Sequence, residues 1–170
     1  MKRRTRVRLH TSRFFRPAEG LGWEYLHVCV DDATRLAYSE VLPAETGAST
    51  ADFLQRAARW LGTLGVPVER VMTDNAFAYR SHAFQAVLQG LGARHLRTRP
   101  YTPRTNGKAE RFIQTSLREW AYRRAYRTSA ARTDALGSFL RHYNGERPHT
   151  ALQRRPPLAR FFELSEQRPC

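Results

Sequence analysis

A marked alternation of apolar and polar residues lies near the start of the chain, between residues 22 and 30. This stretch is rich in aromatic and β-branched side chains, which favours a β-strand. The polar residues 31–35 are typical of a turn, and residues 36–42 supply a returning strand. The pattern therefore predicts a β-hairpin over 22–42. A shorter strand is predicted ahead of it, at 6–10.

Beyond the hairpin, helix and strand patterns follow one another. A capping box over Ser49–Asp52 opens the first helix, and Gly92 ends the second. The first helix runs from the capping box to 62–65 and is followed by a buried strand at 66–73, a helix at 81–91 and a strand at 93–98. After a turn at 105–107, a further helix runs to about 126, and a last helix spans 129–143. This order predicts an α/β fold with a mixed sheet. Prolines at 148, 156 and 157 predict an irregular tail.

The charge of the chain indicates its kind of partner. The 170 residues carry a formal charge of +14, and 41% of them are hydrophobic. This length fits one domain with a real core, and the charge favours nucleic acid over a merely basic surface. The segment 1–20 holds seven Lys or Arg residues and no acid before Glu19, which is typical of a phosphate-binding arm or of disorder. No zinc-ligand spacing, membrane-length apolar run or signal peptide is apparent, so a cytoplasmic protein is expected.

The stretch from Arg97 to Trp120 has the composition of a nucleic-acid site. Cations and two prolines form its loop, and Glu110 follows on the first turn of a helix that Thr105 or Asn106 can cap. A carboxylate inside a basic site repels the phosphate groups of a nucleic acid. A divalent cation bound between carboxylate and phosphate usually accounts for such a residue. Asp74, at the end of a buried strand, is the partner carboxylate, with the thirty-five residues 75–109 between the two.

Three motifs occur in a fixed order: TDN at 73–75, PYTPRTNGKAER at 100–111 and YNGERPH at 143–149. Together they resemble the DDE catalytic core of retroviral integrases and insertion-sequence transposases, from about Leu21 to about Phe161. The resemblance implies a ribonuclease-H-like fold, with a five-stranded mixed sheet flanked by helices. It divides the chain into a basic segment at 1–20, disordered or a truncated first strand, an integrase core at 21–162 and a tail at 163–170.

The resemblance also implies a chemistry. Family members hold two Mg²⁺ or Mn²⁺ ions with Asp, Asp and Glu, and they join transposon 3′ ends to target DNA by phosphodiester transfer. Asp74 and Glu110 match the second and third carboxylates, as catalytic residues and metal ligands. A dimer or larger assembly on DNA, associated with the nucleoid of a prokaryote, is implied as well. No helix-turn-helix domain is apparent, which suggests a fragment or a product that acts with another polypeptide.

The first aspartate of the family is missing from its expected place. The segment before the hairpin, VRLHTSRFFRPAEG, contains none. In the family, a leucine–histidine pair precedes this aspartate. If Leu9 and His10 match that pair, Ser12 occupies the position of the aspartate. The weaker alternatives are Asp31, Asp32, Glu19 and Glu24. Mg²⁺ binds poorly when its set of oxygen ligands is incomplete, so weak or no strand transfer is expected. A shifted reading frame or a truncated gene would explain the loss of the aspartate.

Five side chains of the central stretch are candidates for DNA contact, with a solvated or packed position as the alternative for each: Arg99, Tyr101, Arg104, Lys108 and Arg111. Trp120, Tyr122 and Tyr126 are expected in a core or interface. Three functions stay open: a DDE core, a non-enzymatic DNA-binding remnant and a ribonuclease-H-like nuclease. Metal-dependent cutting separates the remnant from the other two, and joining of a 3′-hydroxyl end separates the core from the nuclease.

Overall fold

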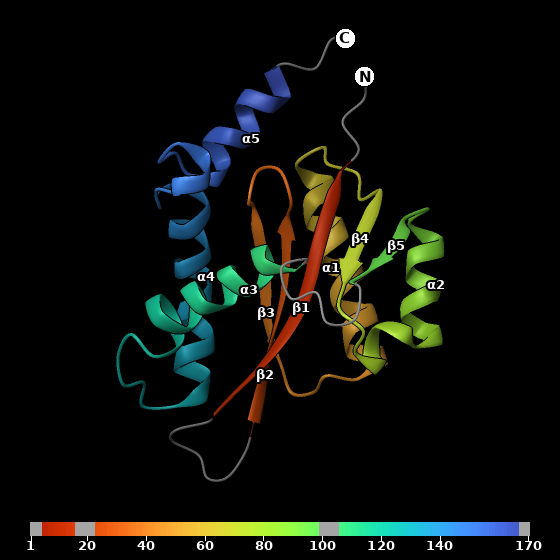
Figure 1. The fold of residues 1–170 in the computed structure, drawn as a ribbon. Coiled ribbons are helices and arrows are strands. Elements are labelled where there is room, and N and C mark those ends of the chain that lie inside the picture. The colour runs from red at the N-terminus through yellow and green to blue at the C-terminus, as the bar shows by residue number, and fades with distance from the viewer. Residues whose placement is uncertain (1–4, 16–22, 99–105, 167–170) are drawn as a thin grey trace.

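The computed structural model describes residues 5–15, 23–98 and 106–166, and it shows a five-stranded sheet in the order β3-β2-β1-β4-β5 (Figure 1). The strands are β1 (Arg6–Phe15), β2 (Trp23–Asp31), β3 (Ala37–Leu42), β4 (Arg70–Thr73) and β5 (Arg94–Arg97). The sheet is mixed, because β1 pairs antiparallel with β2 and parallel with β4. The predicted α/β fold with a five-stranded mixed sheet is thereby confirmed.

The central strand, β1, is longer than the predicted strand at 6–10. It extends to Phe15 because it pairs with β2 from Val7, opposite Asp31, to Phe15, opposite Trp23. Its alternate residues face two different cores, with Val7 in one and Phe14 in the other. Part of the basic stretch at the start of the chain therefore belongs to the middle of the sheet.

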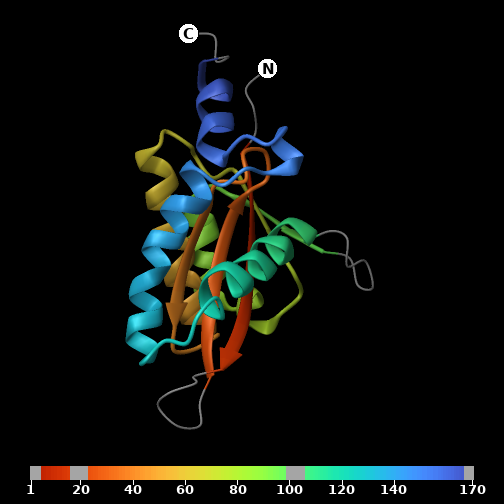
Figure 2. The same cartoon turned by 90° about the vertical axis from the view of Figure 1, so that its left-hand side faces the viewer.

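Helices cover both faces of the sheet (Figure 2). On one face α1 (Gly47–Thr63) and α2 (His82–Gly90) bury a core around Leu54 and Phe84. On the other face α3 (Gly107–Ser116) and α4 (Ser129–Gly145) bury a core around Phe112 and Trp120. The two faces explain the alternation of β2, since Cys29 contributes to the first core and Val28 to the second.

Two helix boundaries differ from the prediction. The N-cap of α1 is Thr46, whose side chain accepts from the backbone N–H of Ser49, so the cap precedes the predicted box. The helix that carries Glu110 ends at Ala121 instead of near 126, because α3 passes into a π-helical turn, η3 (Leu117–Ala121), which interrupts the regular hydrogen-bond ladder. The remaining predicted elements agree with the structure within a few residues.

The prediction of an irregular tail is wrong for residues 157–166. Those residues form α5 (Pro157–Glu166), which is preceded by a short 3-10 turn, η4 (Thr150–Leu152). Proline suits the first position of a helix, since the missing N–H has no partner there in any case. Phe161 of α5 is buried in the first core, which explains why this helix forms.

Candidate nucleic-acid interface and carboxylate site

Strand β4 delivers Asp74 at its carboxyl end. Oδ1 of Asp74 accepts from the backbone N–H of Ala76 at 2.9 Å, and Oδ2 lies 2.9 Å from Nδ1 of His10. Because a carboxylate only accepts, His10 is the donor. Burial alone would raise the pKa of the Asp74 carboxyl, but the hydrogen bonds from His10 and Ala76 outweigh burial and lower it. Asp74 is therefore an ionised carboxylate with both oxygens engaged.

The residue beside Asp74 on the neighbouring strand is His10. The parallel register pairs Arg8 with Met72, and two residues further along it sets His10 against Asp74. Ser12 lies on the same face of β1, about 7 Å further along the strand. The fold therefore brings an imidazole, rather than the Ser12 hydroxyl, to the side of Asp74.

Glu110 stands in the first turn of α3, and Asn106 holds that turn over β1. The side-chain amide of Asn106 donates to the carbonyl oxygen of Leu9 at 3.1 Å. Asn106 is the N-cap residue but makes no side-chain capping bond, because its amide is used on β1 instead. Since Leu9 precedes His10, the elements that carry Asp74 and Glu110 converge on the same part of β1 (Figure 1).

Glu45, in the loop between β3 and α1, is a carboxylate near this site that the sequence analysis missed. The pKa of Glu45 is raised, first by loss of hydration and then by the negative charge of Asp74, while His10 and Arg13 act in the opposite direction. A single acid in a loop carries no motif, so only the folded arrangement reveals its position.

The described residues do not supply a complete set of metal ligands. Within residues 5–15, 23–98 and 106–166, no three His, Cys, Asp or Glu side chains lie close enough together to hold an ion. Both oxygens of Asp74 are engaged, and its neighbour His10 offers a hydrogen-bond donor rather than a further oxygen ligand. Mg²⁺ requires near-octahedral oxygen ligands, so this arrangement does not fit it.

Asp31 has a structural role at the turn between β2 and β3. Its Oδ2 accepts from the backbone N–H of Thr34 at 2.9 Å and from the Thr34 hydroxyl at 2.5 Å. Asp31 pairs with Val7, which lies three residues before His10. The turn is therefore about 10 Å along β1 from the contact between His10 and Asp74, outside direct reach of a shared ion.

Asp32 ties three segments together, and its loss is expected to weaken the fold. It accepts from Arg8 Nε at 2.7 Å and from Arg6 Nε at 2.8 Å, and Lys108 Nζ lies 2.5 Å from Oδ1. Burial would raise the pKa of Asp32, but these cations outweigh burial and hold it far below its usual value. The free energy that the carboxylate contributes is therefore complete above the unfolded-state pKa and is lost as pH falls toward the folded-state pKa.

We expect Asp32→Asn to lower the free energy of unfolding by about 2 kcal/mol at neutral pH. The difference from the unaltered chain should be equal at pH 6 and pH 8 and should shrink below about pH 4. Urea unfolding at each pH measures it. Asp52→Asn, which removes an exposed acid of α1, is the control and should change little. A difference that grows as pH falls would contradict the assigned role.

Two of the five predicted DNA contacts lie in the described part of the chain. Arg99, Tyr101 and Arg104 fall outside the described residues. Lys108 and Arg111 both line a groove of about 630 Å³ between α3 and the segment 143–151. We call it the basic groove, since the described residues of its lining include five Lys or Arg and no Asp or Glu; the five are Arg35, Lys108, Arg111, Arg118 and Arg147.

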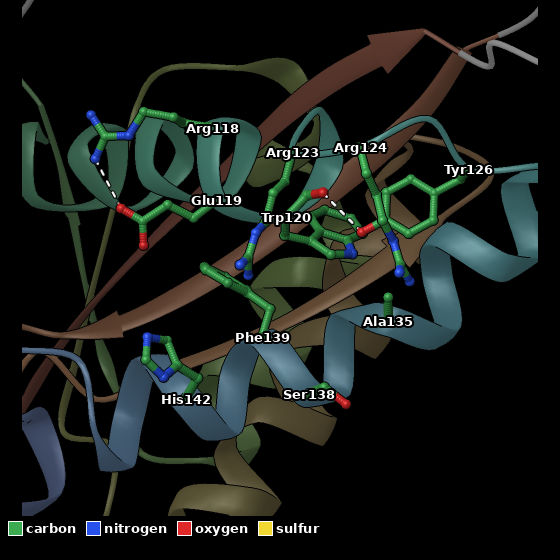
Figure 3. A pocket seen from close by; sticks show the side chains of 10 residues that line it. All are labelled: Arg118, Glu119, Trp120, Arg123, Arg124, Tyr126, Ala135, Ser138, Phe139 and His142. Atoms are coloured by element: carbon green, nitrogen blue, oxygen red, sulfur yellow. Dashed lines mark hydrogen bonds and ion pairs between the residues drawn. The ribbon is translucent and has the colours of Figure 1, made fainter.

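A further cavity, of about 740 Å³, lies at the other end of α3, between η3 and α4 (Figure 3). Its wall includes Trp120, which is 1% exposed and donates from Nε1 to the carbonyl oxygen of Arg132 at 2.8 Å. The Tyr126 hydroxyl donates to the carbonyl oxygen of Trp120 at 3.0 Å, as drawn in Figure 3. The prediction that Trp120 belongs to a core is confirmed, and its buried ring offers no platform for a base. Tyr122, in contrast, is 55% exposed.

The fold and the site together define a class of protein. A mixed five-stranded sheet carries one carboxylate after β4 and one on a helix that crosses β1, beside a cationic groove. This is the architecture of the ribonuclease-H-like fold. None of the helices in the described part of the chain could span a bilayer.

The chain belongs to the integrase core domain family. One sequence profile described as an integrase core domain matches residues 10–103, and a second with the same description matches residues 91–157. The resemblance to integrases and insertion-sequence transposases is thereby confirmed. Proteins of this family are transposases and integrases, which transfer phosphodiester bonds of DNA and typically depend on divalent metal ions.

Several known proteins are similar to the chain. An uncharacterised protein of Caenorhabditis elegans, K02A2.6, is 31% identical over 81% of the chain and 10% of its own length. A 39.2 kDa protein of insertion element IS476 from Xanthomonas euvesicatoria is 32% identical over 75% of the chain and 36% of its own length. A chain of the simian T-cell lymphotropic virus intasome in complex with a PP2A regulatory subunit has a TM-score of 0.71 at 21% identity, over 96% of this chain and 54% of the viral one. The chain thus spans only part of each of these relatives.

Proposed function

We propose that this chain is a DNA-binding transposase or integrase core whose own phosphodiester transfer is weak or absent. In this proposal Asp74 and Glu110 are the second and third carboxylates of the DDE set, and His10 occupies the place of the first. The supporting observation is the 2.9 Å hydrogen bond between His10 Nδ1 and Asp74 Oδ2. A donor at this position competes with a cation for the carboxylate oxygen instead of adding a ligand.

DNA is the proposed partner, because the chain carries a formal charge of +14 and places cations beside Glu110. One structural neighbour belongs to an intasome. By analogy with that protein we propose that this chain acts as a dimer or larger assembly at DNA ends and target DNA, on the nucleoid of a prokaryotic cytoplasm. Mg²⁺ or Mn²⁺ is the cofactor proposed for a complete site in such an assembly.

Nicking of supercoiled plasmid in Mn²⁺ tests the proposal. We expect the unaltered chain and Glu110→Gln to nick at similar, low rates, because the ligand set is incomplete in both. A working metal site loses about 10–100-fold in activity when even an outer partner of one ligand is removed. Rapid nicking that Glu110→Gln abolishes would therefore overturn the proposal. Glu45→Gln would then show whether Glu45 supplies the missing carboxylate.

A further inference from the structure

The basic groove has walls of different origin. One wall is the exposed side of α3 and η3, with Arg111 on α3 and Arg118 on η3, and the other is the segment 143–151. The second wall is held in shape by the ring of His149, which packs edge-on against Tyr143 with centroids 4.6 Å apart. The tail motif YNGERPH, for which the sequence offered no chemical role, therefore forms one wall of the basic groove.

Acids behind the groove orient its cations without lining it. Glu119 accepts from Arg147 Nε at 2.7 Å and from Arg147 Nη2 at 2.8 Å, and Asp32 similarly holds Lys108. A guanidinium held along one edge keeps further N–H donors for a ligand. Arg111 is exposed, and no ion pair of its side chain occurs among the described residues. The groove thus presents pre-oriented cations together with an available one.

The cationic surface continues along the length of α3. Arg118, whose side chain is 72% exposed, lines both the basic groove and the cavity of Figure 3, where Arg123 and Arg124 follow. Residues 107–121 extend for about 20 Å along the helix. One DNA strand carries a phosphate about every 3.4 Å, so about six phosphates match this length.

The groove also adjoins the carboxylate site. Gln114 lines the groove and lies four residues after Glu110, so the two side chains are neighbours on the surface of α3. A strand lying in the groove would therefore pass close to Glu110.

We propose that the basic groove binds the phosphate backbone of one DNA strand and leads it to the face of α3 that carries Glu110. The inference rests on the proposed function, in which the chain acts on DNA. It adds Arg118, on the same wall as Arg111, and Arg147, on the other wall, as backbone contacts. Contacts of this kind position a strand without reading its sequence.

Fluorescence anisotropy of a labelled DNA duplex over a range of NaCl concentrations tests the groove. Arg111→Gln combined with Arg118→Gln is expected to weaken binding on the order of ten-fold and to reduce the slope of log affinity against log salt by about 2. The combination Arg111→Lys and Arg118→Lys keeps both charges and should keep most of the slope. Arg59→Gln combined with Arg94→Gln removes the same charge from exposed positions outside the groove, on α1 and β5, and should leave the slope unchanged.

The possible failures are distinguishable. If the unaltered chain shows no salt-dependent binding, the proposed function fails. If it binds and the groove variant keeps the slope and affinity of the control, the groove inference is overturned. Circular dichroism checks that each variant is folded. Arg111→Gln alone, at an exposed position, keeps the test decisive should the double variant unfold, and its slope is expected to fall by about 1.

Discussion

Replacing Glu24 by glutamine is expected to lower the free energy of unfolding by about 3–5 kcal/mol, because it breaks a buried ion pair. Glu24 is 7% exposed, and its Oε2 accepts from Nη2 of Arg132, which is 0% exposed, at 2.6 Å. Glutamine preserves the shape but removes a negative charge that lies against a buried guanidinium. The ring of Phe14, 4.5 Å from the Arg132 guanidinium carbon, cannot replace a carboxylate.

Urea unfolding followed by circular dichroism measures this loss. Glu146→Gln is the matched control, since Glu146 is 76% exposed and pairs with His142 on the surface of α4. The same substitution there should have little effect, because exposed ion pairs contribute little. Glu24→Leu combined with Arg132→Met should recover much of the loss, as an apolar pair of similar size often does. If Glu24→Gln is no worse than the control, the pair is not a stability element.

The role of Glu24 also bears on the search for a third metal ligand. As a carboxylate without a motif, Glu24 is a weak candidate in the sequence. The structure places it on β2 against the start of α4, where Arg132 and the Ser129 hydroxyl engage its two oxygens. A carboxylate committed in this way is not available to an ion beside Asp74.

The order of strands and helices could be predicted because each apolar period is local. The length of β1 could not, because its alternate positions include cations. Arg8 is 7% exposed in the middle of the sheet, and Asp32, 24 residues away, stabilises it there by accepting its hydrogen bond. A partner at that distance leaves no trace in a local pattern. The helix at 157–166 was hidden for a similar reason, since its stability depends on burying Phe161 against a remote core.

The positions of Asp74 directly after β4 and of Glu110 in the first turn of α3 could be predicted, because each lies in a motif at the boundary of an element. The candidate site was not predictable where the answer depends on strand register. Choosing between His10 and Ser12 requires the pairing of β1 with β4, which joins residues 64 positions apart. His10 and Ser12 are two residues apart and lie on the same face of the strand. The alternation of side chains therefore cannot distinguish between them.

Replacing His10 by aspartate is expected to create a Mn²⁺ site. The register sets residue 10 beside Asp74, so the variant faces one carboxylate with another in place of a hydrogen-bond donor. Two adjacent carboxylates repel unless a cation lies between them. We expect the affinity for Mn²⁺ to rise at least about ten-fold, by comparison with the losses that follow removal of a ligand's partner. Calorimetry with Mn²⁺ alone measures the affinity, and plasmid nicking should appear in parallel.

Ser12→Asp is the decisive control, because it adds the same charge to the same face of the same strand. Both variants add a carboxylate to the same face of β1, but Ser12→Asp places it further from Asp74 and keeps the hydrogen bond from His10. If Ser12→Asp binds Mn²⁺ more tightly, the assignment from the register is overturned and the leucine–histidine pair is the better guide. Adding Glu110→Gln to His10→Asp then tests whether Glu110 binds the same ion. A gain that Glu110→Gln removes requires an ion shared by β1, β4 and α3, whereas a gain that survives it confines the ion to the two strands.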